Sequence, residues 1–268
     1  QIRKVNDLMA GIYIHIPFCR QACHYCDFHF SVKQEGREKI VFSLIKEMEL
    51  QQDYLQREEI NTIYLGGGTP SLLSQGELER IFDGLHHYFN IDKHAEITLE
   101  ANPDDLTIKK IEALKLSPVN RLSIGIQSFF DTDLKWMNRA HSSQQALSSV
   151  KDAQAAGFNN VSIDLIYGLP DSNVDQWKEN LSQAFELNVQ HLSCYCLTIE
   201  PRTALASFIK SGKSKNVDDE LSATQFEMLI SKSREAGWQH YEISNFCKPD
   251  FFSRHNAAYW TGQKYLGL

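Results

Sequence analysis

The segment Cys19-Arg20-Gln21-Ala22-Cys23-His24-Tyr25-Cys26 places three cysteines within eight residues of a 268-residue chain. Cysteine thiolates bind soft metal ions and iron–sulfur clusters, so this spacing predicts a metal or cluster site. A structural zinc ion takes four ligands, and no second Cys-x2-Cys or His-x3-His pair completes such a set. His24 or His29 could supply a fourth ligand, which keeps zinc as an alternative. A [4Fe–4S] cluster held by three cysteines would leave one iron open to a substrate.

The composition is that of a folded, acidic protein. The chain carries 27 Lys and Arg against 34 Asp and Glu, a formal net charge of −7, and 42% of its residues are hydrophobic. The acidic balance argues against a protein that binds nucleic acid through charge alone. No apolar run approaches the roughly 20 residues of a membrane-spanning helix, and no secretory signal opens the sequence. We therefore expect a cytoplasmic protein with reduced cysteines and no membrane span.

Six apolar strands alternate with helices in the first three quarters of the chain. Strands are predicted at 11–16, 60–65, 95–100, 121–126, 161–165 and 191–197, and helices at 37–57, 107–116, 142–156 and 173–187. A further helix begins at Ser74, where Glu77 completes a capping box. This alternation predicts a parallel sheet with right-handed crossovers. Six units instead of eight predict an α/β fold that is an open, partial (β/α)6 TIM-like barrel.

Polar residues and glycines follow successive strands of the predicted sheet. One such position would be ordinary punctuation between a strand and a loop. Several in register favour a site, because chemistry in these folds collects at the carboxyl ends of the strands. The positions are Gly66 to Thr69, Glu100, Gln127, Asp164 and Thr198.

The alternation ends after residue 197. Helices are predicted at 204–210 and 218–235 and a strand at 238–246, and an aromatic-rich run follows at 251–260. We expect residues 1–200 to form the barrel. We expect residues 201–268 to begin a smaller α+β segment of a longer chain, and Met9 to be a natural start behind an N-terminal extension.

The cysteine loop resembles the cluster motif of the radical S-adenosylmethionine (radical SAM) superfamily, because Cys19-x3-Cys23-x2-Cys26 follows the first strand. The resemblance implies a [4Fe–4S] cluster held by these three cysteines. Its open iron would be chelated by the amino and carboxylate groups of SAM. One electron from the cluster would then cleave the sulfonium to methionine and a 5′-deoxyadenosyl radical.

Four longer blocks resemble the oxygen-independent coproporphyrinogen III oxidase group within that superfamily. They are Tyr13-Ile14-His15-Ile16-Pro17-Phe18-Cys19, Gly66-Gly67-Gly68-Thr69-Pro70-Ser71, Arg121-Leu122-Ser123-Ile124-Gly125-Ile126-Gln127-Ser128-Phe129 and Asp164-Leu165-Ile166-Tyr167-Gly168-Leu169-Pro170. The resemblance implies a set of cofactor-binding residues around SAM: Tyr13, Tyr25, Gly67, Gly68, Thr69, Glu100, Gln127, Arg139, Asp164 and Thr198.

The residue types agree with those roles. Arg139 offers a planar fork that suits a carboxylate. Glu100 and Asp164 can accept hydrogen bonds from ribose hydroxyls or an ammonium group. Asp164 lies within an apolar strand, so we expect it to be buried with a partner. Gln127 could equally be a satisfied core amide.

Two departures separate the chain from the oxidases. Phe28 stands where the oxidases have a further cysteine, and only 18 residues precede Cys19, where they have a long arm. Both features are similar to the sister family of haem chaperones, HemW, whose members pass haem to respiratory enzymes. His255-Asn256-Ala257-Ala258-Tyr259-Trp260 matches the His-Asn-x-x-Tyr-Trp motif of that family.

The resemblance therefore implies haem as a third cofactor, with His255 as its ligand and haem-accepting proteins as partners. Without the resemblance, a histidine hydrogen-bonded within an aromatic core would be the simpler interpretation. The sequence predicts a haem chaperone. The alternatives are a radical SAM oxidase that decarboxylates the propionates of coproporphyrinogen III, and a structural zinc protein.

Overall fold

The computed structural model describes residues 9–268, and the proposed N-terminal extension lies outside them. Six strands are parallel and adjacent in chain order: β1 (Met9–Ile16), β2 (Glu59–Gly67), β3 (Ile91–Ala101), β4 (Arg121–Gln127), β5 (Val161–Tyr167) and β6 (His191–Cys196). They form part of one nine-stranded mixed sheet in the order β7-β8-β6-β5-β4-β3-β2-β1-β9. The ends of this order do not pair, so the sheet is open. The predicted partial (β/α)6 barrel is confirmed.

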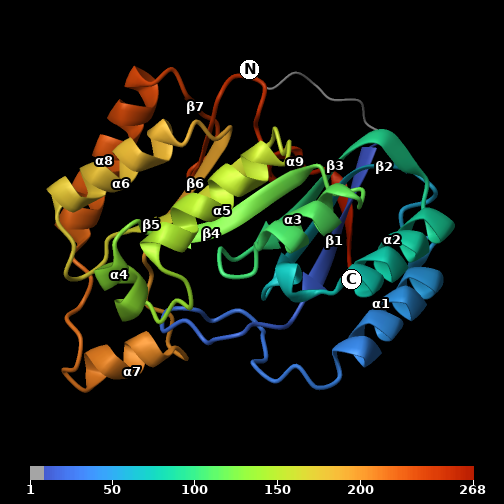
Figure 1. The fold of residues 1–268 in the computed structure, drawn as a ribbon, viewed down its shortest axis with the longest axis horizontal. Helices are drawn as coiled ribbons and strands as arrows, with labels where there is room; N and C mark the ends of the chain where they lie inside the picture. Colours follow the sequence, from blue (N-terminus) through green and yellow to red (C-terminus); the bar gives the residue numbers. More distant parts are fainter. Residues whose placement is uncertain (1–8) are drawn as a thin grey trace.

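Helices connect these strands and cover the outer side of the curved sheet (Figure 1). Local sequence signals explain where several of them begin. The hydroxyl of Ser74 accepts the backbone N–H of Glu77 (3.3 Å), and the Glu77 carboxylate accepts that of Ser74 (2.7 Å), so the predicted capping box is confirmed. The helices are α1 (Arg37–Gln51), α2 (Gln75–Tyr88), α3 (Ile108–Lys115), α4 (Asp131–Trp136), α5 (Ser143–Ala155) and α6 (Val174–Glu186), with a short 3-10 helix η1 (Pro70–Leu72).

Two details of these helices differ from the prediction. Helix α1 ends at Gln51, not at residue 57; residues 52–57 form turns, in which Gln56 and Arg57 have positive φ angles of 54° and 61°. Helix α4 was not predicted, since its six residues are too short for a periodic pattern. No helix within residues 9–268 is long and apolar enough to span a membrane. The cytoplasmic location stays a prediction.

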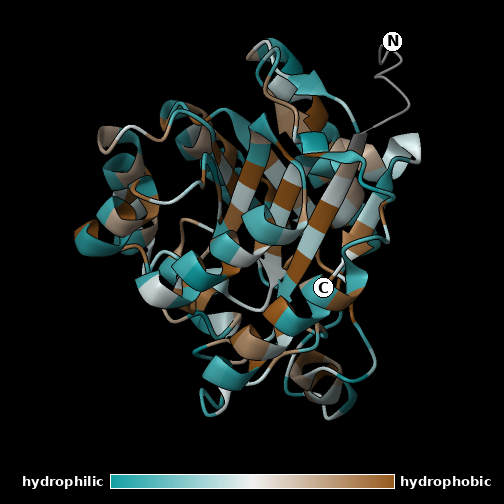
Figure 2. Cartoon of the chain, turned by 90° about the vertical axis from the view of Figure 1, so that its right-hand side faces the viewer, coloured by the Kyte–Doolittle hydropathy of each residue, from teal (hydrophilic) through white to brown (hydrophobic). Residues whose placement is uncertain are grey.

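The two faces of the sheet differ in polarity. In β1, Ile12, Ile14 and Ile16 belong to the buried apolar core, whereas Tyr13 and His15 alternate with them on the opposite face. Figure 2 shows the same banding between hydrophobic and hydrophilic residues along the strands. Because strand residues alternate between faces, apolar residues pack under the helices and polar ones fill the inside of the barrel. The polar side is therefore available for a site.

The segment after β6 extends the same sheet at both edges. It forms α7 (Ala204–Lys210), α8 (Asp219–Glu235), β7 (Gln239–His240), β8 (Asn245–Cys247), α9 (Arg254–Thr261) and β9 (Lys264–Gly267). Strand β8 is antiparallel to β6, and β9 is parallel to β1. The prediction of one strand over 238–246 is wrong, because a bend at residues 241–244 folds it into the pair β7 and β8. The domain boundary at residue 200 stays a prediction.

Candidate functional site

A cavity of about 680 Å³ lies at the carboxyl ends of β2 to β6. Its wall comes from these strand ends, from the cysteine loop after β1, and from the bend between β7 and β8. Tyr13 and His255 are not among the lining residues. All other predicted site residues line the cavity: Cys19, Cys23, Tyr25, Cys26, Gly67, Gly68, Thr69, Glu100, Gln127, Arg139, Asp164 and Thr198. Positions far apart in the sequence thus meet around one space.

The three loop cysteines face this cavity as free thiols. Within residues 9–268, no three His, Cys, Asp or Glu side chains converge on a single metal ion, as a zinc site would require. Each thiolate of a [4Fe–4S] cluster binds a different iron, so separated thiols around one cavity fit a cluster. Burial raises the pKa of Cys19, and it raises that of Cys26 to about 11. The positive charge of iron would therefore be needed to ionise them.

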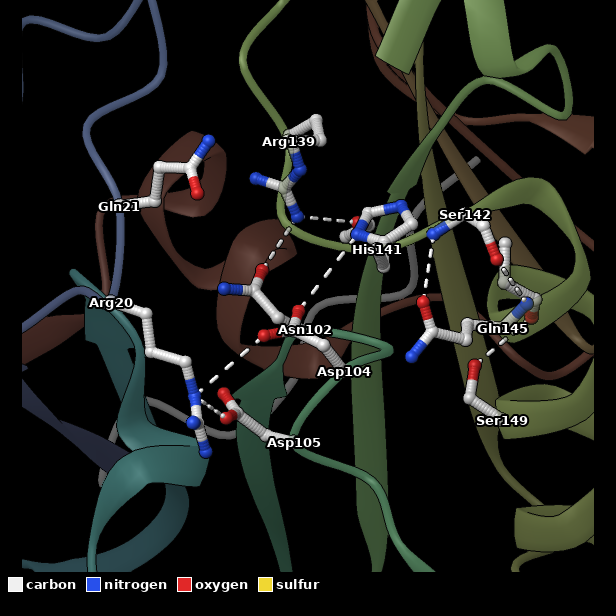
Figure 3. A network of polar contacts seen from close by, with 12 residues as sticks. Arg20, Gln21, Asn102, Asp104, Asp105, Arg139, His141, Ser142, Gln145 and Ser149 are labelled. Atoms are coloured by element: carbon white, nitrogen blue, oxygen red, sulfur yellow. Dashed lines mark hydrogen bonds and ion pairs between the residues drawn. The ribbon is translucent and has the colours of Figure 1, made fainter. Parts of the chain in front are cut away.

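The cysteine loop is tied to the barrel by the residue that follows Cys19. Arg20 Nε donates to Asp105 Oδ1 (2.6 Å) and lies 3.6 Å from Asp104 Oδ2. Figure 3 shows Arg20 reaching from the loop to these two carboxylates. The buried Asp105 also accepts from Ser71 Oγ (2.8 Å), which lies in η1 after the glycine run. The loop and the end of β2 are thereby joined through one carboxylate.

Arg139 contacts both a cysteine of the loop and the strand ends. Its Nη2 donates to Asn102 Oδ1 (2.6 Å) and to the Gly125 carbonyl (2.7 Å), and its Nη1 donates to Cys23 Sγ (3.4 Å). The buried Nε has no hydrogen-bond partner among the described residues. A buried donor without a partner is costly, and a carboxylate is the group that a guanidinium binds best. Arg139 therefore fits the carboxylate of a ligand in the cavity.

Two carboxyl groups lie deeper in the cavity wall. Glu100 accepts from the Tyr64 hydroxyl (2.8 Å) and from the backbone N–H of Gly67 (3.2 Å). Asp164 accepts from Ser123 Oγ (3.2 Å), so the partner expected for it is present. Burial raises the pKa of Glu100 to about 7 and that of Asp164 to about 6. A cationic ligand would favour their ionised forms.

The glycine run brings the end of β2 against the cysteine loop. A Cβ atom on Gly68 would lie 2.7 Å from the carbonyl oxygens of Ile16 and Phe18, directly before Cys19. Gly67 has a φ of 103°, and a Cβ there would overlap the His15 ring. Glycine is therefore required by the chain's own packing at both positions. Both residues also line the cavity, where their backbone can approach a ligand.

His255 lies beneath the cavity, toward the amino ends of the strands, and is 2% exposed. Its Nδ1 pairs with Thr62 Oγ1 (2.9 Å) and its Nε2 with the Tyr259 hydroxyl (3.0 Å). Its ring stacks on that of Tyr64 with centroids 5.2 Å apart, and the Tyr13 ring stacks on both. Burial lowers the pKa of His255 to about 4, so the imidazole is neutral at pH 7. We call Thr62, Tyr64, His255 and Tyr259 the floor cluster.

A buried carboxylate fixes the helix that carries His255. Glu96 on β3 accepts the backbone N–H groups of Arg254 (3.2 Å) and His255 (3.1 Å), at the amino end of α9. Ser253 caps the same end by accepting the N–H of Asn256 (3.3 Å). A negative charge at this end also complements the helix dipole. The position of His255 is thus set by β3 and not by α9 alone.

Sequence reasoning missed several residues of the cavity wall. Asn102 directly follows β3, two residues after Glu100, and the period-two spacing of a strand could have placed both on the same side. Tyr195 lies near the end of β6, two residues after Ser193, and the same spacing could have indicated it. No feature of the sequence indicated Ile243. It reaches the cavity only because the chain bends between β7 and β8, where the sequence predicted a continuous strand.

Known proteins share both the motifs and the fold. The model of the radical SAM superfamily matches residues 13–184. The haem chaperone HemW of Bacillus subtilis is 35% identical over 262 residues, which cover 97% of this chain and 69% of that protein. The haem chaperone HemW of Escherichia coli is 38% identical over 260 residues, 96% of this chain and 68% of that protein. The chain belongs to the HemW family of the radical SAM superfamily.

A solved structure agrees with the architecture of this HemW-family chain. The coproporphyrinogen III oxidase HemN of Escherichia coli, a radical SAM enzyme, matches with a TM-score of 0.82 and 23% identity. The match covers 98% of this chain and 63% of the oxidase, and it shows a shared fold. This chain therefore spans about two thirds of the length of these relatives. Membership of the superfamily implies a [4Fe–4S] cluster and SAM, which fit the thiols and the free Arg139 Nε of the cavity.

Proposed function

We propose that this protein is a haem chaperone that holds a [4Fe–4S] cluster and SAM, binds haem and delivers it to haem proteins. One observation carries the proposal: the similarity to curated haem chaperones runs through 96–97% of the chain. At that coverage it extends well beyond the barrel strands. The exposed Phe28 supports it, since no fourth cysteine follows the cluster motif there.

The cavity residues divide into two roles in this proposal. Cys19, Cys23 and Cys26 bind three irons and leave the fourth open. When bound, the cluster supplies the single electron that cleaves the sulfonium of SAM. Arg139 Nε donates to the SAM carboxylate, because it is a buried donor without a partner. The remaining contacts come from Tyr25, Gly67, Gly68, Thr69, Glu100, Gln127, Asp164 and Thr198, while Tyr13 supports the site from beneath.

His255 is the proposed haem ligand, and its surroundings suggest which nitrogen binds iron. The partner of Nε2 is the hydroxyl of Tyr259, a half-exposed side chain that can rotate away. Nδ1 would keep its proton and donate to Thr62, the arrangement that orients metal-bound imidazoles in proteins. The low pKa keeps the ring neutral, as ligation requires. Haem binding at Nε2 therefore needs Tyr259 to move but leaves the Thr62 contact intact.

Exposed aromatic side chains near this helix are suited to an apolar macrocycle. Trp260 is 66% exposed and Tyr265 is 48% exposed. The Tyr259 and Tyr265 rings meet edge to face at 4.9 Å, so a movement of Tyr259 would rearrange both. Aromatic rings bury large areas and pack well on flat ligands. Haem at His255 would cover this surface.

The test is haem titration of the anaerobically reconstituted protein, followed by the Soret absorption. We expect stoichiometric binding, loss of the band in His255→Ala, and an unchanged band in His86→Ala, which removes an exposed histidine of α2. Tyr259→Phe should bind haem at least as tightly, because it frees Nε2. An unchanged band in His255→Ala would remove the ligand assignment.

The same preparation separates the alternatives. Incubation with coproporphyrinogen III, SAM and a reductant should give no protoporphyrinogen. Formation of that product would overturn the chaperone proposal in favour of the oxidase. Metal analysis that found one zinc and no iron would favour the structural zinc protein.

A further inference from the structure

Asn102 lies between the two side chains that contact the cluster cysteines. Its carbonyl Oδ1 accepts from Arg139 Nη2 (2.6 Å), and its Nδ2 donates to Thr69 Oγ1 (3.2 Å). Arg139 in turn donates to Cys23 Sγ (3.4 Å), and Thr69 donates to Cys19 Sγ (3.5 Å). Figure 3 shows Asn102 between Arg139 and the carboxylates that bind Arg20. One amide therefore links two cysteines through two different donors.

We propose that Asn102 is a positioning residue of the SAM and cluster site, and that it acts through Arg139 and Thr69. The inference rests on the SAM binding of the proposed function and is independent of haem. Nothing in the sequence motifs assigned Asn102 a role, although it lines the same cavity.

Only a neutral amide supplies both contacts. An aspartate could accept from Arg139, but it could not donate to Thr69. Its charge would also pair with the guanidinium and weaken the attraction of Arg139 for a ligand carboxylate. An alanine would remove one acceptor from Arg139 Nη2 and the donor to Thr69, and the loss of a hydrogen bond to a charged group is the costly case. The site therefore depends on the amide and not only on the size of residue 102.

The backbone of Asn102 is linked to the cysteine loop through Ser71 and Asp105. Its N–H donates to Ser71 Oγ (3.3 Å), and Ser71 donates to Asp105, the carboxylate that binds Arg20 (2.6 Å). Ser71 and Asp105 are buried, so the contact between them is shielded from water, whereas Arg20 reaches Asp105 from the exposed loop. Asn102 is thereby fixed relative to the loop from one side, while its amide fixes Arg139 from the other. A rigid support of this kind keeps a ligand-binding group at its working geometry.

The experiment measures SAM affinity by equilibrium dialysis, with the potential of the reconstituted cluster as a second readout. We expect Asn102→Ala to weaken SAM binding roughly tenfold and Asn102→Asp to weaken it further. Both should shift the cluster potential, since donors to the cysteine sulfurs change. Asn90→Ala, at an exposed position after α2, should match the unsubstituted protein.

A double substitution separates positioning from a general loss of structure. If Asn102 acts through Arg139, then Asn102→Ala should cost little further SAM affinity once Arg139→Lys is present. Losses that simply add would overturn the inference, as would unchanged affinity and potential in both Asn102 variants. Asn102→Asp is close to isosteric, so it serves if Asn102→Ala fails to fold. Absence of SAM binding by the unsubstituted protein would overturn the proposed function as well, which distinguishes the two failures.

Discussion

The cavity and the floor cluster lie one above the other inside the same barrel, but their polar groups are in opposite states. In the cavity, Arg139 Nε has no partner among the described residues. In the floor cluster, both ring nitrogens of His255 have one. Arg121, 1% exposed, also has unpartnered nitrogens, but it is not among the residues that line the cavity. Open hydrogen-bonding capacity beside empty space marks a site ready for a ligand, whereas a satisfied group must first be released.

The comparison predicts that the two regions can be disabled separately, and the largest expected effect is at the cysteines. Cys23→Ala should abolish the brown [4Fe–4S] absorption, because two thiolates cannot hold the cluster. Haem binding should persist, since the floor cluster contains no cysteine. The measurement is iron content together with the Soret band of the same sample. Cys247→Ala, which changes a buried cysteine of β8, serves as the control.

Loss of haem binding in Cys23→Ala would contradict the separation of the two regions, because it would place the cluster and haem in one site.

Glu100→Gln tests the region where the cavity meets the floor cluster, through the Tyr64 hydrogen bond. SAM affinity of the unsubstituted protein should fall as pH drops below about 7, because the protonated carboxyl no longer attracts a cation. Glu100→Gln should bind SAM about tenfold more weakly at pH 8, and its affinity should fall only near pH 6, where Asp164 is protonated. The measurement is the SAM affinity of both proteins between pH 6 and 8. A parallel pH profile in both proteins would contradict the assignment of Glu100.

The contribution of Glu100 to the free energy of unfolding of the SAM-free protein should have the opposite pH dependence to its contribution to SAM affinity. A folded-state pKa of about 7 exceeds the ordinary value, so the contribution of Glu100 to stability is fully present below pH 4.5 and is lost as pH rises through 7. From pH 5 to pH 8, Glu100→Gln should therefore gain about 2 kcal/mol relative to the unsubstituted protein. Urea denaturation at the two pH values measures this difference. If the two proteins differed in unfolding free energy by the same amount at pH 5 and at pH 8, Glu100 would not be buried as a neutral acid.

Glu96→Gln probes the floor cluster alone and should have the smallest effect. Removing the charge that caps α9 should lower the free energy of unfolding by about 1 kcal/mol. Haem affinity should fall with it, while SAM affinity stays unchanged. Glu47→Gln, on the exposed face of α1, controls for the loss of one charge. A change in SAM affinity equal to that in haem affinity would show that α9 also supports the cavity.

The sequence predicted the cavity better than the floor cluster, for a physical reason. Strand ends are set by local patterns, and parallel strands bring their carboxyl ends together whatever the loops do. Glu100 and Asp164 could therefore be placed at the same edge of the sheet from the strand pattern alone. Helix α9 depends on Glu96, which is 158 residues from Arg254 in the chain, and no local signal carries that contact. The positive φ of Gln127 (69°) is likewise set by its surroundings.

The aromatic motif at 255–260 shows how far a sequence motif can predict a binding site. Its match to a family predicted a haem ligand, and the structure shows a helix whose histidine is already paired on both nitrogens. A motif records which residues occur together but not the state in which their atoms are held. Whether His255 binds iron stays a prediction that the haem titration decides.

The anchoring of the cysteine loop has a consequence for how the cofactor is inserted. The contacts that anchor the loop do not involve the cysteine sulfurs: Asn138 Nδ2 donates to the Ala22 carbonyl (2.7 Å), the N–H of Leu205 donates to the His24 carbonyl (2.8 Å), and Arg20 binds Asp105. Removal of a cluster would break none of these contacts, so we expect them to keep the loop ordered on the barrel. If air oxidation removes iron, the loop should therefore remain in place as a template on which a cluster can be rebuilt.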